Sequence, residues 1–560
     1  MLNTVNKPKS RTGLLSYLLI LLFTVSITLL LYFINGKSLI GIDDANIYMV
    51  YMRNFAHGHG FVYNIGGERV EGFTSLLWTL TGSVFYHLSN RPEVSLLILN
   101  ILIVSYAIWR ICSFINVKFS EPSFLSGRVI FFLALLISLP GYYEWSVLSL
   151  METGLWSSLI ILNVLNLFEF NPEDAKRSDI QFSILLFLTI LCRPEAILWC
   201  AFFLAMRFLK IYSYVQVKRE TMFRMILTVT VYLLTIVLLF IWQDSYFRYL
   251  FPNTYYAKVG SDRFENIRAG MKYLAEYFKK APFVFLIFIL LLKELITQLN
   301  DKLSYDPLKL RSSFPLFVFT GIFLIAFSIP MFSGGDHFAF NRMMQPTVPL
   351  FLLYFLFATE YYHFTLSRSW KALILFFVII GSDFSLFYTI RNQYSPLKEE
   401  WTIALSDRNT SEKLNDYFNV LPGYPSQGVM TAGGSAYSYK GVTIDLLGLN
   451  NTKMAHADAL KDNTILKDHA SFNKIVFYQQ CPDLFWFVGG FGPNDKIERI
   501  NIPKINNLIF KRIADDKRFY QEYAQCIIFR KDKPENLQIF ASKKFLNSLD
   551  TAYYKVLLFN

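Results

Sequence analysis

The stretch GKSLIGIDDANIYMVYMRNFAHGHGFVYNIGGERVEGF, residues 36–73, is a charged and polar segment between two apolar runs. The run before it, residues 13–34, matches the ~20 helical residues that a bilayer requires. Lys7, Lys9 and Arg11 precede this run, so the positive-inside rule places the N-terminus in the cytoplasm and the polar segment on the far side. No small-residue cleavage site follows the run, which indicates an anchor rather than a removed signal peptide.

The composition also indicates a membrane protein. Hydrophobic residues make up 53% of the 560 residues and charged residues only 17%, below the quarter or so that is usual in soluble domains. Residues 391–560 hold 40 of the charged residues. We therefore expect a transmembrane domain over residues 1–390 and a soluble domain over residues 391–560. The net charge of +12 is spread over loops, which favours membrane topology over nucleic-acid binding.

Further apolar runs divide the first domain. They lie near residues 73–90, 94–116, 128–145, 153–169, 181–192, 195–209, 225–243, 283–298, 313–331, 346–365 and 371–390. Basic residues mark the loops 210–224, 293–311 and 368–371 as cytoplasmic. Alternation from these loops makes 73–90 a re-entrant or juxtamembrane helix and predicts a polytopic α-helical protein with about 11 crossings, the N-terminus inside and the C-terminus outside.

The soluble domain is predicted to be α/β or α+β. Its β-rich runs GVMTAG, GVTIDLL, KIVFYQQC and QCIIFRKD alternate with polar, helix-compatible segments. The string TIDLLGLNN either contacts the mouth of a site or packs in the core. Cys481 and Cys526 are equally expected to form a disulfide or to stay free.

Asp43 and Asp44 are neighbouring carboxylates close to the end of the first apolar run. Neighbouring carboxylates raise each other's pKa, so holding both at a membrane surface is costly. They either cap the helix that follows, because Asp is favoured at helix N-termini, or carry out chemistry. Arg53 and Glu71 lie in the same polar segment and favour the second interpretation.

Two further far-side segments carry isolated charges. Glu152 lies among Trp and Leu residues, where a carboxylate is poorly hydrated and is either functional or a helix N-terminal residue. Arg193 and Glu195 interrupt an apolar stretch on either side of Pro194. They either tie a turn between two short spans as an ion pair, or Arg193 faces a cavity that accepts an anion.

The last two far-side segments combine cations with aromatic residues or glycines. DSYFRYLFPNTYYAKVG contains Tyr255, Tyr256 and Lys258, and is either an interfacial aromatic belt or a site for a phosphate-bearing lipid. FSGGDHFAFNRMMQP contains Asp336, His337 and Arg342 at the mouth between two spans. For the histidine, a structural role is favoured over a metal ligand. Phosphate-cradling glycine loops, nucleophile elbows and zinc-protease helices are absent from the sequence.

Together these strings resemble the GT-C membrane glycosyltransferases, most closely the branch with the mycobacterial terminal β-arabinofuranosyltransferase. The first match, DDANIYMVYMRNFAHGHGFVYNIGGERVEGFTSLLW, is specific. Matches follow in order at MET (151–153), RPE (193–195), PNTYYAK (252–258), GGD (334–336) and AGGSAYSYKGVTIDLLGLNN in the soluble domain. The resemblance covers roughly residues 40 to 455.

The resemblance implies sugar transfer, usually with inversion, from a polyprenyl-phosphate donor to a hydroxyl of a cell-envelope glycan, lipid or protein. It assigns Asp43 as the general base, and Asp44 as a residue that orients the acceptor or binds a divalent cation such as Mg²⁺, Mn²⁺ or Ca²⁺. Lys258, Arg193 and Arg342 would stabilise the departing phosphate. The other expected substrate contacts are Arg53, Glu71, Glu152, Glu195, Tyr255, Tyr256, Asp336 and His337.

The resemblance further implies a bacterial inner membrane with the soluble domain in the periplasm. The alternatives are a non-catalytic relative, a flippase for lipid-linked glycans, and a glycan polymerase or ligase. Acceptor recognition by the soluble domain is a hypothesis that rests on its position alone. The sequence leaves the sugar, the acceptor and the oligomeric state open.

Overall fold

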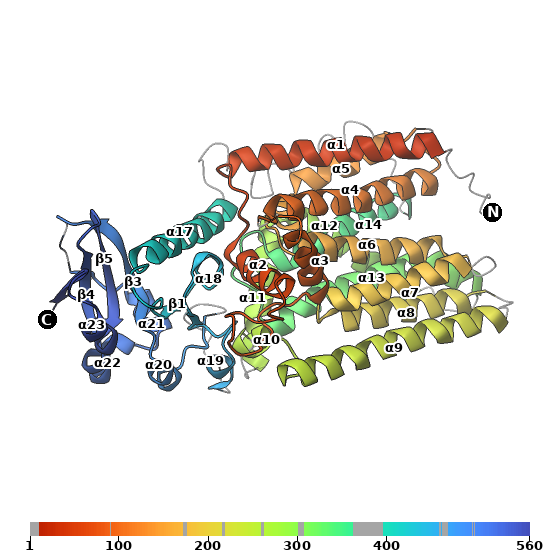
Figure 1. Ribbon diagram of the computed structural model, residues 1–560. Helices are drawn as coiled ribbons and strands as arrows, with labels where there is room; N and C mark the ends of the chain where they lie inside the picture. Colours follow the sequence, from red (N-terminus) through yellow and green to blue (C-terminus); the bar gives the residue numbers. More distant parts are fainter. Residues whose placement is uncertain are drawn as a thin grey trace.

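A computed structural model describes most of the chain. The described residues are 10–89, 91–121, 123–171, 176–214, 219–258, 263–300, 307–361, 396–458, 461, 469–495, 497 and 499–559. The predicted span 371–390, the basic loop 368–371 and the predicted domain boundary lie outside them. The described part forms a helical bundle followed, end to end, by a smaller domain that contains a β-sheet (Figure 1).

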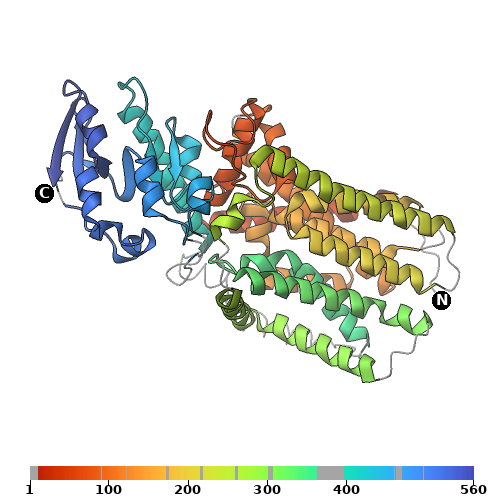
Figure 2. The same ribbon diagram turned by 90° about the horizontal axis from the view of Figure 1, so that it is seen from below.

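The bundle is a set of apolar helices that run side by side (Figures 1 and 2). Its members are α1 (Ser10–Ile34), α4 (Glu93–Lys118), α5 (Gly127–Ser138), α6 (Thr153–Glu169), α7 (Lys176–Cys192), α8 (Ala196–Tyr212), α9 (Arg219–Phe247), α12 (Pro282–Asn300), α13 (Pro307–Ser333) and α14 (Val348–Tyr361). Helix α6 is buried along most of its length, whereas α9 exposes leucines and isoleucines such as Leu238 and Ile241. Exposed apolar side chains in such number are stable only against lipid.

Length and composition identify four described helices that can cross a membrane, namely α1, α4, α9 and α13. Helix α11 (Arg263–Lys280) and α12 meet at a bend of 107° and would add a fifth span if they acted together. The protein is thus a polytopic α-helical membrane protein. The predicted total of about 11 crossings stays a prediction.

Short helices cap the end of the bundle that faces the second domain (Figure 1). They are α2 (Asp43–Ala56), α3 (Leu76–Tyr86), η1 (Glu144–Leu148), α10 (Asn253–Lys258) and η3 (Arg342–Thr347), with α11 beside them. The 11 residues of α3 rise only ~16 Å, too little to cross a bilayer. This agrees with the juxtamembrane helix predicted within residues 73–90.

The second domain is built around a six-stranded mixed sheet with the order β2-β1-β3-β5-β4-β6. The strands are β1 (Gln427–Val429), β2 (Thr443–Asp445), β3 (Leu484–Pro493), β4 (Tyr523–Arg530), β5 (Glu535–Ser542) and β6 (Tyr554–Phe559). The helices are α17 (Pro396–Tyr417), α18 (Gly433–Ser438), α19 (Thr452–His456), α20 (Lys474–Gln480), α21 (Lys504–Ile509), η4 (Ile513–Asp515), α22 (Lys517–Glu522) and α23 (Lys543–Ser548). Strand β1 pairs in parallel with β2 and β3, and the other pairs are antiparallel.

One predicted strand is wrong. The run KIVFYQQC forms α20, because the side chain of Asn473 accepts hydrogen bonds from the amides of Ile475 and Val476 and so caps a helix. Cys481 ends this helix in a left-handed conformation with φ 41°. Cys481 and Cys526 are both free.

The polar segment 36–73 is packed between the two domains. Arg408 of α17 is buried, donates to Glu93 at 2.8 Å and to Asn46 at 2.6 Å, and lies over the ring of Tyr437. Asn64 exchanges two side-chain hydrogen bonds with the backbone of Thr443, at 2.8 and 3.0 Å. These contacts therefore hold the second domain against this end of the bundle, where it forms one side of any site.

Replacing Arg408 should separate the domains. The change Arg408→Ala leaves Glu93 buried without its cation, and we expect a loss of ~3–5 kcal/mol in the free energy of unfolding. Lys413→Ala, on the same helix, breaks an exposed ion pair with Glu535 and should cost about 1 kcal/mol at most. Thermal unfolding of the purified protein in detergent compares the two variants, and equal losses would contradict the role given to Arg408.

Candidate active site

A cavity of about 530 Å³ lies where the loops at the end of the bundle converge. The charged groups in its lining are Asp44, Glu152, Arg193, Glu195, Lys258, Asp336 and Arg342. The apolar residues in its lining include Trp156, Trp199, Ala326, Ile329, Phe332 and Pro346. From the second domain, Leu449 reaches the lining, so the string TIDLLGLNN does contact the mouth. The polar segment 36–73, the segment of Glu152, the PNTYYAK string and the GGD string thus each contribute residues to one pocket.

Glu152 is brought to the cavity by an irregular backbone. The π-helix η1 ends at Leu148, and Leu150 then adopts a left-handed conformation with φ 59°, which is unusual for a side chain of this size. The Trp78 indole donates to the Leu150 carbonyl at 3.2 Å and holds this turn. Glu152 follows at the start of α6, and its side chain is only 1% exposed.

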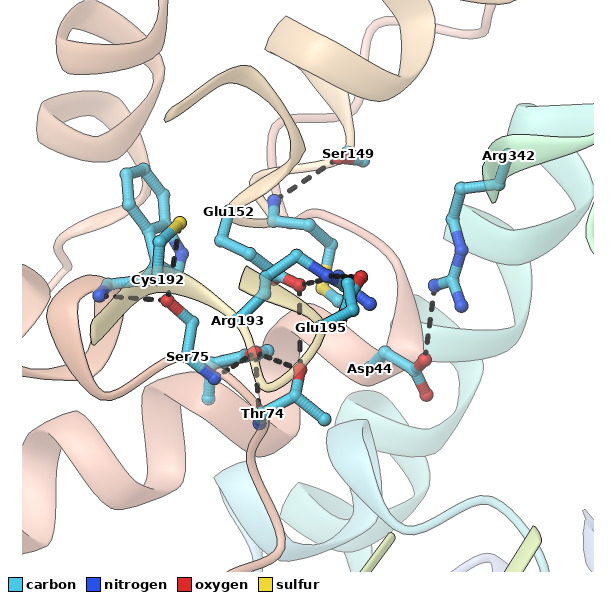
Figure 3. A network of polar contacts seen from close by, with 12 residues as sticks. Asp44, Thr74, Ser75, Ser149, Glu152, Cys192, Arg193, Glu195 and Arg342 are labelled. Carbon is cyan, nitrogen blue, oxygen red and sulfur yellow. Dashed lines mark hydrogen bonds and ion pairs between the residues drawn. The ribbon is translucent and has the colours of Figure 1, made fainter. Parts of the chain in front are cut away.

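Arg193 forms ion pairs with two carboxylates at once (Figure 3). Pro194 separates α7 from α8, and in this turn Arg193 donates to Glu195 at 2.5 Å and to Glu152 on the neighbouring loop. The ion pair ties the turn, and the same arginine lines the cavity, whose binding of an anion stays a prediction.

A chain of hydroxyl groups supports Glu152 from the other side (Figure 3). Thr74 donates to Glu152 Oε1 at 3.5 Å and shares a hydrogen bond of 2.9 Å with the hydroxyl of Tyr48. Tyr48 also accepts from the amides of Thr74 and Ser75. The second oxygen of Glu152, Oε2, is buried without a hydrogen-bond partner among the described residues. An unsatisfied buried carboxylate oxygen of this kind is suited to a substrate hydroxyl.

Arg342 connects the remaining carboxylates. Its Nε donates to Asp336 at 3.1 Å, and its Nη1 lies 3.5 Å from Asp44 (Figure 3). Phe338 lies under the guanidinium at 4.0 Å from the ring centre. Burial alone would lower the pKa of Arg342, but Asp336 and Asp44 raise it above its ordinary value, so the cation is firmly charged.

Asp43 is not among the residues that line the cavity, and its expected role as the general base stays a prediction. Its carboxylate accepts hydrogen bonds from the backbone amides of Gly433 at 3.0 Å and Gly434 at 2.8 Å in the second domain. Successive helical residues point about 100° apart, so Asp44 faces the cavity when Asp43 faces α18. Of the two aspartates, the structure brings only Asp44 to the other charged groups.

Four other expected substrate contacts lie away from this cavity. Arg53 donates to the carbonyl of Tyr437 in the second domain, and His337 stacks on Phe338 and meets the ring of His469 edge-on. Tyr256 packs against the ring of His456. Each of these side chains is turned toward the interface with the second domain, which the sequence of the bundle alone does not reveal.

The fourth, Glu71, lines a small adjoining pocket of about 40 Å³ and is 4% exposed. Both of its oxygens accept from the side-chain amide of Gln243, at 3.1 and 3.2 Å. Burial raises the pKa of Glu71 to about 8, more than the hydrogen bond from Gln243 lowers it. Glu71 is therefore a neutral acid near pH 7 that ties the polar segment to the end of α9.

Several lining residues were missed from the sequence. Tyr48, Thr74, Trp156 and Met343 carry no charge and lie within apolar or helical patterns. A signal existed only for Tyr48, which lies one helical turn after Asp44 and therefore on the same face of α2. The other three lie on loops and helices that only the tertiary fold brings together, so the sequence gives no signal for them.

The donor set of the cavity does not suit a divalent cation. Arg342 contacts both Asp44 and Asp336 and so occupies the place between the two carboxylates. Within the described ranges, no three His, Cys, Asp or Glu side chains gather as metal ligands. The chemistry that this cavity offers is that of its own acids and cations.

No protein-family model and no curated protein matches the chain. Solved structures that are similar include the oligosaccharyltransferase AglB from Archaeoglobus fulgidus in complex with an inhibitory peptide and a dolichol-phosphate, at 9% identity and a TM-score of 0.46, covering 97% of this chain and 75% of that one. A second is ArnT from Cupriavidus metallidurans bound to undecaprenyl phosphate, at 10% identity and a TM-score of 0.45, covering 94% and 98%. The Archaeoglobus fulgidus oligosaccharyltransferase in the apo form has 10% identity and a TM-score of 0.49, covering 97% and 76%. Likenesses of this size assign neither family nor activity.

Glu71 should make stability depend on pH. An acid whose pKa is raised to about 8 in the folded state binds its proton more tightly there, so its contribution to stability is lost as pH rises from the unfolded value toward 8. Glu71→Gln removes this loss. Relative to the wild type, the variant should gain on the order of 4 kcal/mol in the free energy of unfolding as the pH rises from about 5 to about 8.5. Unfolding at both pH values measures it, with the exposed Glu535→Gln as a control that should show no gain.

Proposed function

We propose that the protein is a membrane glycosyltransferase. It transfers a sugar from a polyprenyl-phosphate donor to a hydroxyl group of a cell-envelope acceptor, on the face of the membrane that carries the second domain. The observation that supports this is the cavity itself, whose lining combines carboxylates and cations with apolar side chains and in which Asp44 lies beside Arg342. A lining of this mixed kind suits a donor that is both lipid and phosphate.

Asp44 acts as the general base in this proposal. The acceptor hydroxyl gives its proton to Asp44 while its oxygen forms a bond to the anomeric carbon of the donor sugar. The bond from that carbon to the phosphate oxygen breaks, and the lipid phosphate leaves with the bonding electrons as a dianion. The proton then passes from Asp44 to water. Direct displacement of this kind inverts the anomeric centre.

Arg342 links the two halves of the reaction electrostatically. In the free site it pairs with Asp44 and Asp336. When Asp44 accepts the proton, its charge disappears, and the positive charge of the guanidinium then acts on the phosphate, whose negative charge increases at the same moment. Lys258 and Arg193 line the same cavity and add positive charge. Cations fixed in place before the reaction stabilise such charge without reorganisation.

The remaining acids position hydroxyl groups. Glu152 has an oxygen without a hydrogen-bond partner in the described part of the chain, and Glu195 and Asp336 line the same cavity. Phe251, Tyr255 and Phe332 line the cavity and are also 43%, 48% and 61% exposed, so the cavity continues to the outer surface of the bundle through apolar side chains. A prenyl chain can leave the cavity along such a surface. A bacterial inner membrane, with the N-terminus in the cytoplasm, fits this function.

The direct test is release of lipid phosphate. Purified full-length protein in nanodiscs is mixed with undecaprenyl phosphates bearing different pentoses and hexoses and with a total cell-envelope glycan extract. Mass spectrometry should detect free undecaprenyl phosphate and a glycan heavier by one sugar for at least one donor. A protein that moves the intact donor between leaflets of a vesicle without releasing phosphate would be a flippase, and the proposal would be wrong.

Asp44→Asn should abolish most of the transfer. Base catalysis by a positioned carboxylate is worth ~10²–10⁴-fold, and kcat should fall by this factor while the variant unfolds at the wild-type temperature or higher. The control is Asp416→Asn, which removes a surface carboxylate paired with Lys533 and should keep the wild-type rate. An active Asp44→Asn enzyme would exclude Asp44 as the base.

A further inference from the structure

The carboxylate of Asp43 is bound by the second domain rather than by the cavity. Its Oδ1 accepts from Gly433 N at 3.1 Å and from Gly434 N at 2.8 Å, and its Oδ2 accepts from Gly433 N at 3.0 Å. A Cβ atom at position 433 would collide with the backbone carbonyl of Asp43, so only glycine allows this approach. The contact joins the first residue of α2 to the first turn of α18.

The surroundings of this contact are rigid. Asp407 of α17 accepts from the hydroxyl of Thr431, two residues before Gly433. Tyr63 donates to the carbonyl of Ala432 at 2.5 Å. Arg408, beside Asp407, is fixed to Glu93. The two glycine amides are therefore held in place with respect to the bundle.

We propose that Asp43 is a positioning residue, which uses Gly433 and Gly434 of the second domain to fix the first turn of α2 and so aims Asp44 into the cavity beside Arg342. This inference rests on the proposed function, because it assigns the base to Asp44. It makes the second domain a working part of the site, although that domain contributes only Leu449 to the described lining.

The two aspartates also share an electrostatic environment. Burial raises the pKa of Asp43 to about 6, against the lowering effect of the two amide hydrogen bonds. Burial and the charge of Asp43 raise the pKa of Asp407 to about 7. The titratable and charged groups that surround the pair are Asp336, His337, Arg342, Glu400, Asp407 and Asp445.

The pH profile separates positioning from a purely structural role. Below about pH 6 the wild-type Asp43 takes up a proton and loses the charge that strengthens its bonds to the amides, while its carboxylate form opposes ionisation of the adjacent base. Asp43→Asn keeps an acceptor oxygen but removes both effects. Its acid limb of kcat/KM should therefore move to lower pH by about half a unit or more, with kcat at neutral pH reduced less than about tenfold.

Gly433→Ala tests the geometry without changing charge. The added methyl group displaces α18 from α2, and misplacement of the base should lower kcat by up to ~10²-fold with the KM for the lipid donor unchanged, because donor contacts lie on the bundle. The matched control is Gly423→Ala, since a Cβ at this exposed position meets nothing within 4 Å. The donor is the undecaprenyl-phosphate sugar that the wild type accepts.

Hydrogen–deuterium exchange gives a readout that needs no activity. The amides of Gly433 and Gly434 should exchange faster in Asp43→Ala than in the wild type, while the strands of the sheet stay protected. The inference is overturned if Asp43→Asn is as inactive as Asp44→Asn at every pH, since Asp43 would then be the base. The inference is also overturned if Asp43→Asn and Gly433→Ala both keep the wild-type acid limb of kcat/KM, the wild-type kcat and the wild-type amide exchange rates. If the wild type transfers no sugar, the proposed function is refuted instead. The exchange rates then still show whether Asp43 binds the amides of Gly433 and Gly434.

Discussion

The site depends on one constraint. A charge at a poorly hydrated membrane boundary must be paired with a nearby opposite charge. Two arginines meet it in the same way. Arg193 lies between Glu152 and Glu195, and Arg342 between Asp44 and Asp336. Each arginine joins carboxylates from different parts of the chain, so the pairs also fix the loops that carry them. The result is a cavity lined with both acids and cations. A reaction that moves a proton and a negative charge finds in it both a group that accepts the proton and a group that stabilises the charge.

The second domain completes this arrangement by covering the polar segment that would otherwise face water. Arg408 enters the bundle to reach Glu93, and Asn64 pairs with the backbone next to β2. These contacts keep the groups around α2 in a low-dielectric environment, where ion pairs and hydrogen bonds act more strongly than in water. Recognition of the acceptor by this domain stays a hypothesis, since its described contribution to the cavity is the apolar Leu449.

The sequence predicted the class of fold and most charged members of the cavity, because isolated charges in apolar surroundings are costly and therefore conspicuous. Glu152, Arg193 and Asp336 were found in this way. The resemblance favoured Asp43 as the base, whereas the structure brings Asp44 to the cavity, because the orientation of the pair depends on where α2 begins and on a partner 390 residues away in the chain. Arg53, Tyr256 and His337 contact the second domain instead of the cavity, which the sequence of the bundle does not show. The strand expected at 474–481 failed because one asparagine cap outweighed the β propensity of Ile475 and Val476.

The pairing of Glu93 with Arg408 has a consequence for how the protein is made. The partners are separated by 315 positions, and a ribosome adds residues in order, so α4 exists well before the cation that it needs. Until α17 has been synthesised, Glu93 therefore lacks the cation that pairs with it, and Asn46 and Asn64 lack their partners in the second domain.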